Sequence, residues 1–318
     1  MVVFVFPGQG SQKVGMGKTL SDTFSAARET FDEIDDALSD NLSKICFDGS
    51  PEDLQATSNT QPALFAASMA ILAVLEKHYG FCLHTHVHAL AGHSLGEYTA
   101  LAAAGCFSVR DGAKLLRTRG KAMEKAVPGG KGTMAAILGL DYKAITEICD
   151  QGQSEGTCVL ANDNCVGQVV ISGETAAIAY ATTIALERGA KRVIPLNVSG
   201  PFHSPLMQPA AETMARALEG VTLSTPRIPV IANVSAKPIE KPDDIRINLV
   251  KQLTGTVRWR ESMEYICTNY KHTDCTSMVV ELGAGRVLTG LMGRINKEIM
   301  ACSLETPSDL DTFMKNIT

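Results

Sequence analysis

An apolar stretch, Ala89–His93, runs directly into Gly92-His93-Ser94-Leu95-Gly96 and then into a segment rich in alanine and leucine, Leu95–Ala104. This is a G-x-S-x-G motif with a predicted strand before it and a predicted helix after it. The glycines allow a sharp turn with close backbone neighbours, which lifts the serine hydroxyl out of the sheet. The segment therefore predicts an α/β fold and a candidate nucleophile, Ser94. The alternative is a chance occurrence of the motif in a glycine-rich chain.

Other parts of the chain continue this alternation of strands and helices. Val2–Phe6 is a continuous apolar run, which is typical of a strand buried on both faces of a parallel sheet. Further strands are predicted at Ile228–Asn233 and Met278–Leu282, and helices at Leu20–Leu38, Pro62–His78 and Val109–Ala126. This order predicts an α/β domain with a mostly parallel sheet.

The middle of the chain follows a different order. Predicted strands at 133–138, 158–161, 168–172 and 192–197 alternate with helices at 141–150 and 174–188. The resulting β-α-β-β-α-β order is the ferredoxin-like pattern. We therefore expect a small inserted domain at residues 128–197 and a larger domain formed by residues 1–127 and 198–318.

Composition and charge narrow the class of protein. Charged residues make up 20% of the chain, the net charge is −5 and aromatic residues are only 5%, which argues against a nucleic-acid-binding protein. Nine cysteines without CxxC spacing indicate free thiols in a reducing compartment. The amino terminus does not resemble a signal peptide, and the apolar run Pro62–Leu75 is expected to be too short to span a membrane. We expect a cytoplasmic protein with no membrane segment.

A nucleophilic serine needs a base, and two histidines are candidates. His203 lies where the chain returns from the predicted small domain, and a domain junction is a common place for a cleft. His93 is next to Ser94, but the turn would direct its side chain away from the hydroxyl. We therefore favour His203, and the alternative is that it is only a polar residue of the junction.

The loop Pro7–Gln12 follows the first predicted strand, at the edge of a parallel sheet where ligands bind. It is not a P-loop, because Met16 stands where lysine is required, nor a dinucleotide-binding loop, because Lys13 replaces the third glycine. The loop could supply backbone N–H groups to an oxyanion, or it could be a plain tight turn.

A basic cluster interrupts the predicted helix Val109–Ala126. Arg117 and Lys121 share one face at i, i+4 spacing, whereas Arg119 falls on another face and could point inward. A buried arginine needs an anionic partner. The alternative is an ordinary solvated face.

Cys82, His84, His86 and His88 alternate, as if along one face of a strand. They are suitable zinc ligands, but side chains in a single row cannot close a tetrahedron. We expect an exposed loop and strand start, and no metal.

Six segments together resemble the malonyl-CoA:acyl-carrier-protein transacylase family. They are FVFPGQGSQ, GHSLGEYTAL, RGKAM, ANDNCVGQVVISG, PFHSPLM and LVKQLTGTVRW, and they follow the family's order over nearly the whole chain. The resemblance implies an α/β-hydrolase-like large domain with a ferredoxin-like insert, as the patterns above also predict.

The resemblance also implies catalytic roles. Ser94 matches the acyl-accepting nucleophile and His203 the general base. Gln252 matches the residue whose backbone carbonyl orients that histidine. Gln9 and the backbone N–H of Leu95 match the oxyanion-hole region.

Substrate contacts are implied in the same way. Arg119 matches the arginine that pairs with the free carboxylate of malonate. Met123 and Asn162 match positions that line the acyl or pantetheine site. Gly200 is a mild departure, because alanine or valine is also common there.

The implied activity is that of an acyltransferase of fatty acid biosynthesis. Malonyl-CoA acylates the serine, and the phosphopantetheine thiol of acyl carrier protein then accepts the malonyl group, without metal or redox cofactor. We expect an exposed basic cluster, Arg188, Lys191 and Arg192, to bind the acidic carrier, although it could be a solvated turn. A serine hydrolase and a non-catalytic carrier-binding module are the alternative functions.

Overall fold

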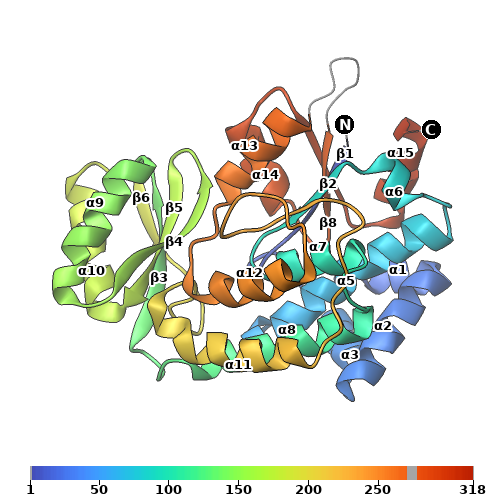
Figure 1. The fold of residues 1–318 in the computed structure, drawn as a ribbon, viewed down its shortest axis with the longest axis horizontal. Coiled ribbons are helices and arrows are strands. Elements are labelled where there is room, and N and C mark those ends of the chain that lie inside the picture. Colours follow the sequence, from blue (N-terminus) through green and yellow to red (C-terminus); the bar gives the residue numbers. More distant parts are fainter. Residues whose placement is uncertain (1, 271–277, 318) are drawn as a thin grey trace.

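The computed structural model describes residues 2–270 and 278–317 and contains two β-sheets (Figure 1). The first sheet consists of β1 (Val2–Phe6), β2 (Ala89–Gly92), β7 (Val230–Ile231), β8 (Met278–Leu282) and β9 (Met300–Leu304). Its strand order is β7-β2-β1-β8-β9, and all neighbouring strands are parallel. This confirms the predicted parallel sheet.

Both faces of the parallel sheet are buried, which explains the unbroken apolar run of β1. Phe4 and Phe6 pack into one core cluster, whereas Val3 and Val5 pack into another on the opposite face. The second cluster is covered by α13 (Trp259–Asn269) and α14 (Val287–Ile295). The first is covered by α2 (Ser25–Leu38), α5 (Thr57–Lys77), α7 (Leu95–Ala103), α8 (Val109–Lys125), α11 (Gln208–Glu219), α12 (Pro242–Thr254) and α15 (Pro307–Ile317).

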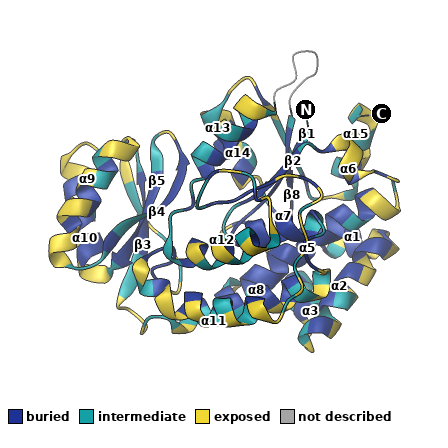
Figure 2. Ribbon diagram, viewed as in Figure 1, coloured by how far each residue is buried: buried dark blue, intermediate teal, exposed yellow. Residues whose placement is uncertain are grey.

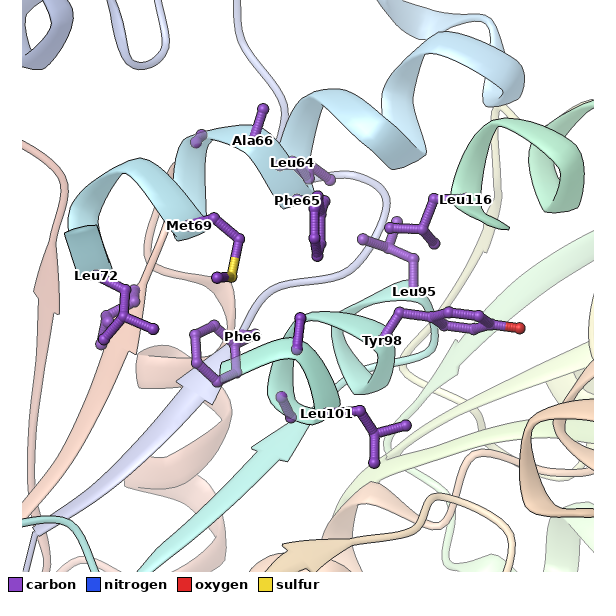
Figure 3. Packing of buried hydrophobic residues seen from close by; sticks show 14 of the residues in the cluster. Phe6, Leu64, Phe65, Ala66, Met69, Leu72, Leu95, Tyr98, Leu101 and Leu116 are labelled. Carbon is purple, nitrogen blue, oxygen red and sulfur yellow. The ribbon is translucent and has the colours of Figure 1, made fainter. Parts of the chain in front are cut away.

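The central helix of the first cluster is α5, which is longer than the sequence suggests. It begins at Thr57 and includes Pro62, which cannot donate to the Ser58 carbonyl; Arg117 donates to that carbonyl instead, at 2.9 Å. It has 21 residues, and an 18-residue window within it has a mean hydropathy of 1.3, so it is long and apolar enough to cross a membrane and the expected short length was wrong. Yet 83% of the apolar window is buried inside the protein, as in the core helix of a soluble fold (Figure 2). Figure 3 shows Phe65 and Met69 of α5 directed toward Phe6 and α7.

Several other predicted elements are corrected. The helix predicted over Leu20–Leu38 is divided, because Phe24 adopts an extended conformation between α1 (Lys18–Thr23) and α2. The strand predicted at Ile228–Asn233 is only the two residues of β7. A short helix, α6 (Leu83–His86), replaces the predicted strand start around Cys82. Two further short α-helices are α3 (Leu42–Asp48) and α4 (Pro51–Gln55).

The second sheet is the predicted β-α-β-β-α-β unit. Its elements are β3 (Gly132–Leu138), α9 (Tyr142–Gly152), β4 (Cys158–Cys165), β5 (Gln168–Glu174), α10 (Thr175–Glu187) and β6 (Arg192–Pro195). The strand order β4-β5-β3-β6 is antiparallel throughout, which is the ferredoxin-like arrangement. α9 and α10 share one core cluster with the sheet, at the left in Figure 1. The predicted fold class is confirmed, while the division at residues 127/128 and 197/198 stays a prediction.

The two sheets are joined where β4 meets the chain that follows α12. Asp163 N–H donates to the Val257 carbonyl at 2.9 Å, and Val257 N–H donates to the Ala161 carbonyl at 2.8 Å. The buried carboxylate of Asp163 also pairs with Arg260 of α13 at 2.7 Å. These contacts fix β4 beside the carboxyl end of the parallel sheet.

Candidate active site

Ser94 lies in the turn between β2 and α7, with φ 53° and ψ −108°. A Cβ on Gly92 would clash with the carbonyl of Gly96, and a Cβ on Gly96 would clash with the carbonyl of Phe6. Both positions of the motif therefore require glycine, since the turn folds tightly against its own helix and against β1. The turn holds the serine at the amino end of α7.

The serine hydroxyl contacts the histidine that the sequence favours. Ser94 Oγ lies 2.8 Å from His203 Nε2, and His203 Nδ1 lies 2.8 Å from the backbone carbonyl of Gln252. Because a carbonyl can only accept, Nδ1 carries the proton and Nε2 is left to accept from the serine. Burial, followed by the positive charge of Arg119, lowers the pKa of His203 to about 3. The imidazole is therefore neutral at pH 7, as a base must be.

His93 does not contact the serine hydroxyl. Its Nε2 lies 2.9 Å from Asn164 Oδ1, and its ring packs 5.6 Å from the ring of Trp259. Burial lowers its pKa. The side chain thus points away from the hydroxyl, as the turn geometry predicts.

Arg119 lies inside the protein with 1% of its surface exposed. Nη2 donates to Ser94 Oγ at 3.0 Å and to Gln252 Oε1 at 2.9 Å, and Nη1 donates to Gln61 Oε1 at 2.8 Å. Within residues 2–270 and 278–317, no acidic side chain forms an ion pair with it. The guanidinium therefore presents a positive charge that only neutral groups contact, beside the nucleophile.

The neighbouring arginine of the same helix has a different place. Arg117 pairs with Asp40 at 2.7 Å, and its side chain is only 12% exposed. Lys121 is exposed. The alternative prediction, that the basic cluster is an ordinary solvated helix face, is therefore correct for Lys121 and wrong for Arg117 and Arg119.

Most of the predicted site residues meet in one cavity of about 370 Å³. Its lining includes Gln9, Ser94, Leu95, Arg119, Met123, Asn162 and His203. Leu95 is the first residue of α7, so its N–H has no carbonyl four residues earlier within the helix. Gln9 Nε2 donates to Thr57 Oγ1 at 3.3 Å, which places the Pro7–Gln12 loop at the cavity wall. Gln252 lies behind His203 and is fully buried.

Two buried residues of the site, Asn233 and Glu97, were not predicted from the sequence. Asn233 accepts from Ser94 N–H at 2.8 Å and donates to the Gly92 carbonyl at 2.7 Å, so it holds the turn on both sides of the serine. Glu97 accepts from Asn233 N–H at 2.9 Å and from Gln252 Nε2 at 2.8 Å. Burial raises the pKa of Glu97 to about 7. Its position three residues after Ser94, on an otherwise apolar helix, is the only sequence signal for it.

The basic cluster lies outside the cavity. Arg188 pairs with Glu147 at 3.0 Å, whereas Lys191 and Arg192 are exposed at the start of β6. The opposite end of β6 leads to Leu196 and the cavity wall.

Within the described residues, no group of three or more His, Cys, Asp or Glu side chains is placed to hold a metal ion.

The chain matches known proteins over almost its full length. A family model described as an acyl transferase domain matches residues 3–282. The malonyl CoA-acyl carrier protein transacylase of Bacillus subtilis is 42% identical over 317 residues, which cover 99% of this chain and 97% of that protein. The solved acyl-carrier-protein-S-malonyltransferase of Bartonella henselae is 50% identical, with a TM-score of 0.95 and 99% of both chains covered. A malonyl-transacylase in complex with its type II PKS acyl-carrier protein is 40% identical, with a TM-score of 0.94 and 99% of both chains covered.

Proposed function

Because the chain belongs to the malonyl-CoA:acyl-carrier-protein transacylase family, we propose that it transfers the malonyl group from malonyl-CoA to the phosphopantetheine thiol of acyl carrier protein. The product supplies fatty acid biosynthesis. One observation carries the choice of acyl group: the buried guanidinium of Arg119 lies 3.0 Å from the nucleophile and forms no ion pair with the described acidic residues. A free carboxylate on the acyl group would satisfy it with charge-assisted hydrogen bonds.

The first half-reaction uses the contacts of Ser94. Oγ attacks the thioester carbonyl while its proton moves to His203 Nε2, which lies 2.8 Å away. The backbone N–H of Leu95 and the Gln9 loop stabilise the oxyanion of the tetrahedral intermediate. The C–S bond then breaks, and the imidazolium returns its proton to the CoA sulfur. Malonyl-Ser94 remains.

The second half-reaction reverses these steps with a different thiol. The carrier's thiol gives its proton to His203 and attacks the malonyl ester, and Ser94 leaves with that proton. The Gln252 carbonyl keeps the imidazole in the same orientation throughout, because it accepts from Nδ1 at 2.8 Å. Met123 and Asn162 line the passage for the acyl and pantetheine parts of both substrates.

The exposed residues Lys191 and Arg192, with Arg188, form the surface that we expect to bind the acidic carrier. The reaction needs no metal or redox cofactor, because each step is a proton transfer or acyl transfer between groups already named. A cytoplasmic location is supported by free thiols such as those of Cys46, Cys106 and Cys302.

The alternative function is that of a serine hydrolase, which would share the turn that holds Ser94 between β2 and α7. A thioesterase or lipase acting on apolar acyl groups would have no use for a buried cation beside the acyl tail, because an unpaired charge is costly to bury. Arg119 therefore favours a transferase of acyl groups that bear a carboxylate.

Intact-protein mass spectrometry after mixing with malonyl-CoA tests the proposal. We expect one malonyl adduct on the wild-type protein and none on Ser94→Ala, which keeps the fold because it removes a single hydroxyl. Addition of carrier protein with its phosphopantetheine arm should remove the adduct and appear as malonyl-carrier. An adduct that persists on Ser94→Ala would place the nucleophile elsewhere.

A further inference from the structure

Glu97 connects the groups that hold the catalytic residues in place. Its Oε2 accepts from Gln252 Nε2 and from Asn233 N–H, so one carboxylate oxygen anchors both residues. Asn233 in turn fixes the backbone around Ser94, and Gln252 fixes the ring of His203. The Glu97 carboxylate accepts from Asn233 and Gln252 and not from the Ser94 hydroxyl or the His203 ring, so its role is positioning. This inference rests on the proposed function.

The side chain of Gln252 lies between Glu97 and Arg119. Its amide N–H donates to Glu97 Oε2 at 2.8 Å, and its amide oxygen accepts from Arg119 Nη2 at 2.9 Å. The amide dipole thus has its positive end toward the carboxylate and its negative end toward the guanidinium. This orientation is the favourable one when both groups are ionised, so the amide transmits the attraction between them.

The elements that pack against α7 leave Arg119 as the main charge near Glu97. β1, β2 and β7 contain no titratable side chain. Tyr98 on α7, His203 beyond Gln252 and Arg119 on α8 are the titratable groups close to Glu97, and Arg119 supplies the charge that acts on its pKa. The other titratable residues of the surrounding helices are Arg110, Asp111, Lys114, Arg117, Lys121, Glu124 and Lys125 on α8, Asp243, Asp244, Arg246 and Lys251 on α12, and Glu76 and Lys77 at the exposed end of α5.

The ionisation of Glu97 is finely balanced. Burial raises its pKa to about 7, and this rise is opposed by the hydrogen bond from Asn233 N–H, then by that from Gln252, and then by the charge of Arg119. Within the described residues, its second oxygen, Oε1, has no hydrogen-bond partner. A change in the charge around Arg119 therefore shifts the protonation of Glu97 in the neutral range.

We propose that Glu97 is the counter-charge of Arg119 in the empty pocket and becomes more fully protonated, with uptake of a fraction of a proton from solvent at neutral pH, when the carboxylate of the malonyl group occupies Arg119. The incoming carboxylate neutralises the guanidinium that stabilised ionised Glu97, so the proton binds to the Glu97 carboxylate. An acetyl group brings no charge and causes no uptake.

Proton uptake makes malonyl binding depend on pH in a defined direction. Binding that takes up a proton is strongest where Glu97 is already protonated, and it weakens as the pH rises through the pKa of about 7. A coupling of one pKa unit limits the change to about tenfold. Acetyl-CoA shares the CoA phosphates but lacks the carboxylate, so the ratio of the two substrates isolates the effect.

Rapid-quench acylation, followed by intact-protein mass spectrometry from about pH 6 to about pH 9, tests this dependence. For each substrate, the acylation rate constant is divided by the half-saturating concentration, and the value for malonyl-CoA is then divided by that for acetyl-CoA. For wild type, we expect this malonyl-to-acetyl ratio to fall by about tenfold. The fall should come from an increase in the half-saturating concentration for malonyl-CoA. Glu97→Gln keeps an acceptor oxygen but no charge, so its ratio should stay at the low-pH value throughout. A flat ratio in wild type, or a wild-type slope in Glu97→Gln, would overturn the proposal.

Two further measurements separate this charge effect from structure. Glu281→Gln neutralises another buried carboxylate, which accepts from the N–H groups of Leu288 and Thr289 at the start of α14, away from the cavity. This variant should retain the wild-type dependence of the malonyl-to-acetyl ratio on pH.

In weakly buffered solution at pH 7, Ser94→Ala should take up a fraction of one proton per malonyl-CoA bound and none per acetyl-CoA. This readout does not depend on whether Glu97→Gln folds, and equal uptake for both substrates would refute the proposal. Failure of wild type to form any malonyl adduct would instead refute the proposed function.

Discussion

Two buried side chains place opposite electrostatic demands on the same pocket. His203 has to be neutral to accept a proton, whereas Arg119 has to be charged to bind a carboxylate. They are compatible because the charge of Arg119 is one of the causes that lower the pKa of His203. The residue that selects the substrate thus also keeps the base unprotonated.

The low pKa of His203 predicts different pH profiles for activity and stability. With a folded-state pKa of about 3, His203 stays neutral between pH 7 and pH 5, so its titration should not reduce the acylation rate in that range. Near pH 6.5 the unfolded chain begins to bind a proton that the folded protein does not, so stability should fall as the pH drops from about 6.5 towards 3. Rapid-quench rates and thermal melts over this range measure both.

The His203→Ala variant is the control for the role of His203 as the base. His203→Ala should lose roughly 10²–10⁴-fold in acylation rate at every pH, because general base catalysis is removed. A wild-type rate that halves near pH 6.5 while the protein remains folded would mean that the base titrates normally.

Arg119→Ala should change acyl selectivity rather than simply reduce activity. Hydrogen bonds to a charged group contribute about 1.5–3 kcal/mol each, so the malonyl-to-acetyl ratio of kcat/KM should fall by tens- to hundreds-fold. Arg119→Lys should restore little of it, because a lysine lacks the planar fork. Arg117→Ala, on the same helix but outside the cavity, should keep the wild-type ratio even if it lowers Tm. An unchanged ratio in Arg119→Ala would remove the physical basis for malonyl specificity.

Single residues differ in how far the sequence reveals them. Ser94 is marked by its glycines and by the strand and helix around it, and Arg119 is marked by falling on a different helical face from Arg117. Asn233 has no such signal, and Glu97 has only its position on α7, because the roles of both depend on contacts between positions 139 and 136 residues apart. Only the folded chain shows what they hold.

At the level of elements, the β2–α7 turn depends on backbone proximity that only glycine allows. Gly96→Ala would drive a methyl group into the Phe6 carbonyl. Overpacking typically costs about 1–3 kcal/mol, so we expect the free energy of unfolding to fall by at least that amount. Gly290→Ala is the matched control, because a Cβ there meets no heavy atom within 4 Å, and it should stabilise α14 by about 0.4–1 kcal/mol. Urea unfolding measures both. Equal midpoints for Gly96→Ala and wild type would show that the turn relaxes.

Local patterns predict long or fully buried elements well and interrupted ones poorly. β8 occupies its predicted residues, Met278–Leu282, because both of its ends coincide with a change in composition. α5 begins five residues before the predicted start, since a proline is tolerated where another side chain satisfies the freed carbonyl. β9 was not predicted, because its sequence, MACSL, is short and only half-buried at the sheet edge. For α5 and β9, packing by distant residues decided the outcome.

At the scale of the whole molecule, the cavity depends on both sheets. Ser94 and Arg119 come from the parallel-sheet part, while Met134 and Asn162 come from the antiparallel sheet. The order of strands and helices was sufficient to predict an inserted unit. The contacts that seat it, Asp163 with Val257 and Arg260, could not be predicted, because nothing local relates β4 to a segment nearly a hundred residues later.

Carrier binding should be sensitive to charge on the small-sheet side of the molecule. Lys191→Glu with Arg192→Glu reverses two exposed charges there, so the second half-reaction should slow and lose its salt dependence while acylation by malonyl-CoA changes little. Lys297→Glu with Lys315→Glu makes the same change in net charge on exposed residues outside that surface and should leave both half-reactions unchanged. Stopped-flow transfer to carrier at several salt concentrations measures the effect. Equal slowing by both double variants would show that only net charge matters.

The place of β1 in the middle of its sheet has a consequence for the nascent chain. Translation produces Phe6 long before Met278, yet β1 needs β8 on one side and β2 on the other. An apolar strand with an open edge is exposed to wrong pairing, so the emerging chain has to be shielded until β8 leaves the ribosome. The antiparallel sheet needs only residues 132–195, so it can close its hydrogen bonds much earlier. The antiparallel sheet can therefore be complete while the chain is still being made, whereas the sheet that carries the nucleophile needs strands from both ends of the chain.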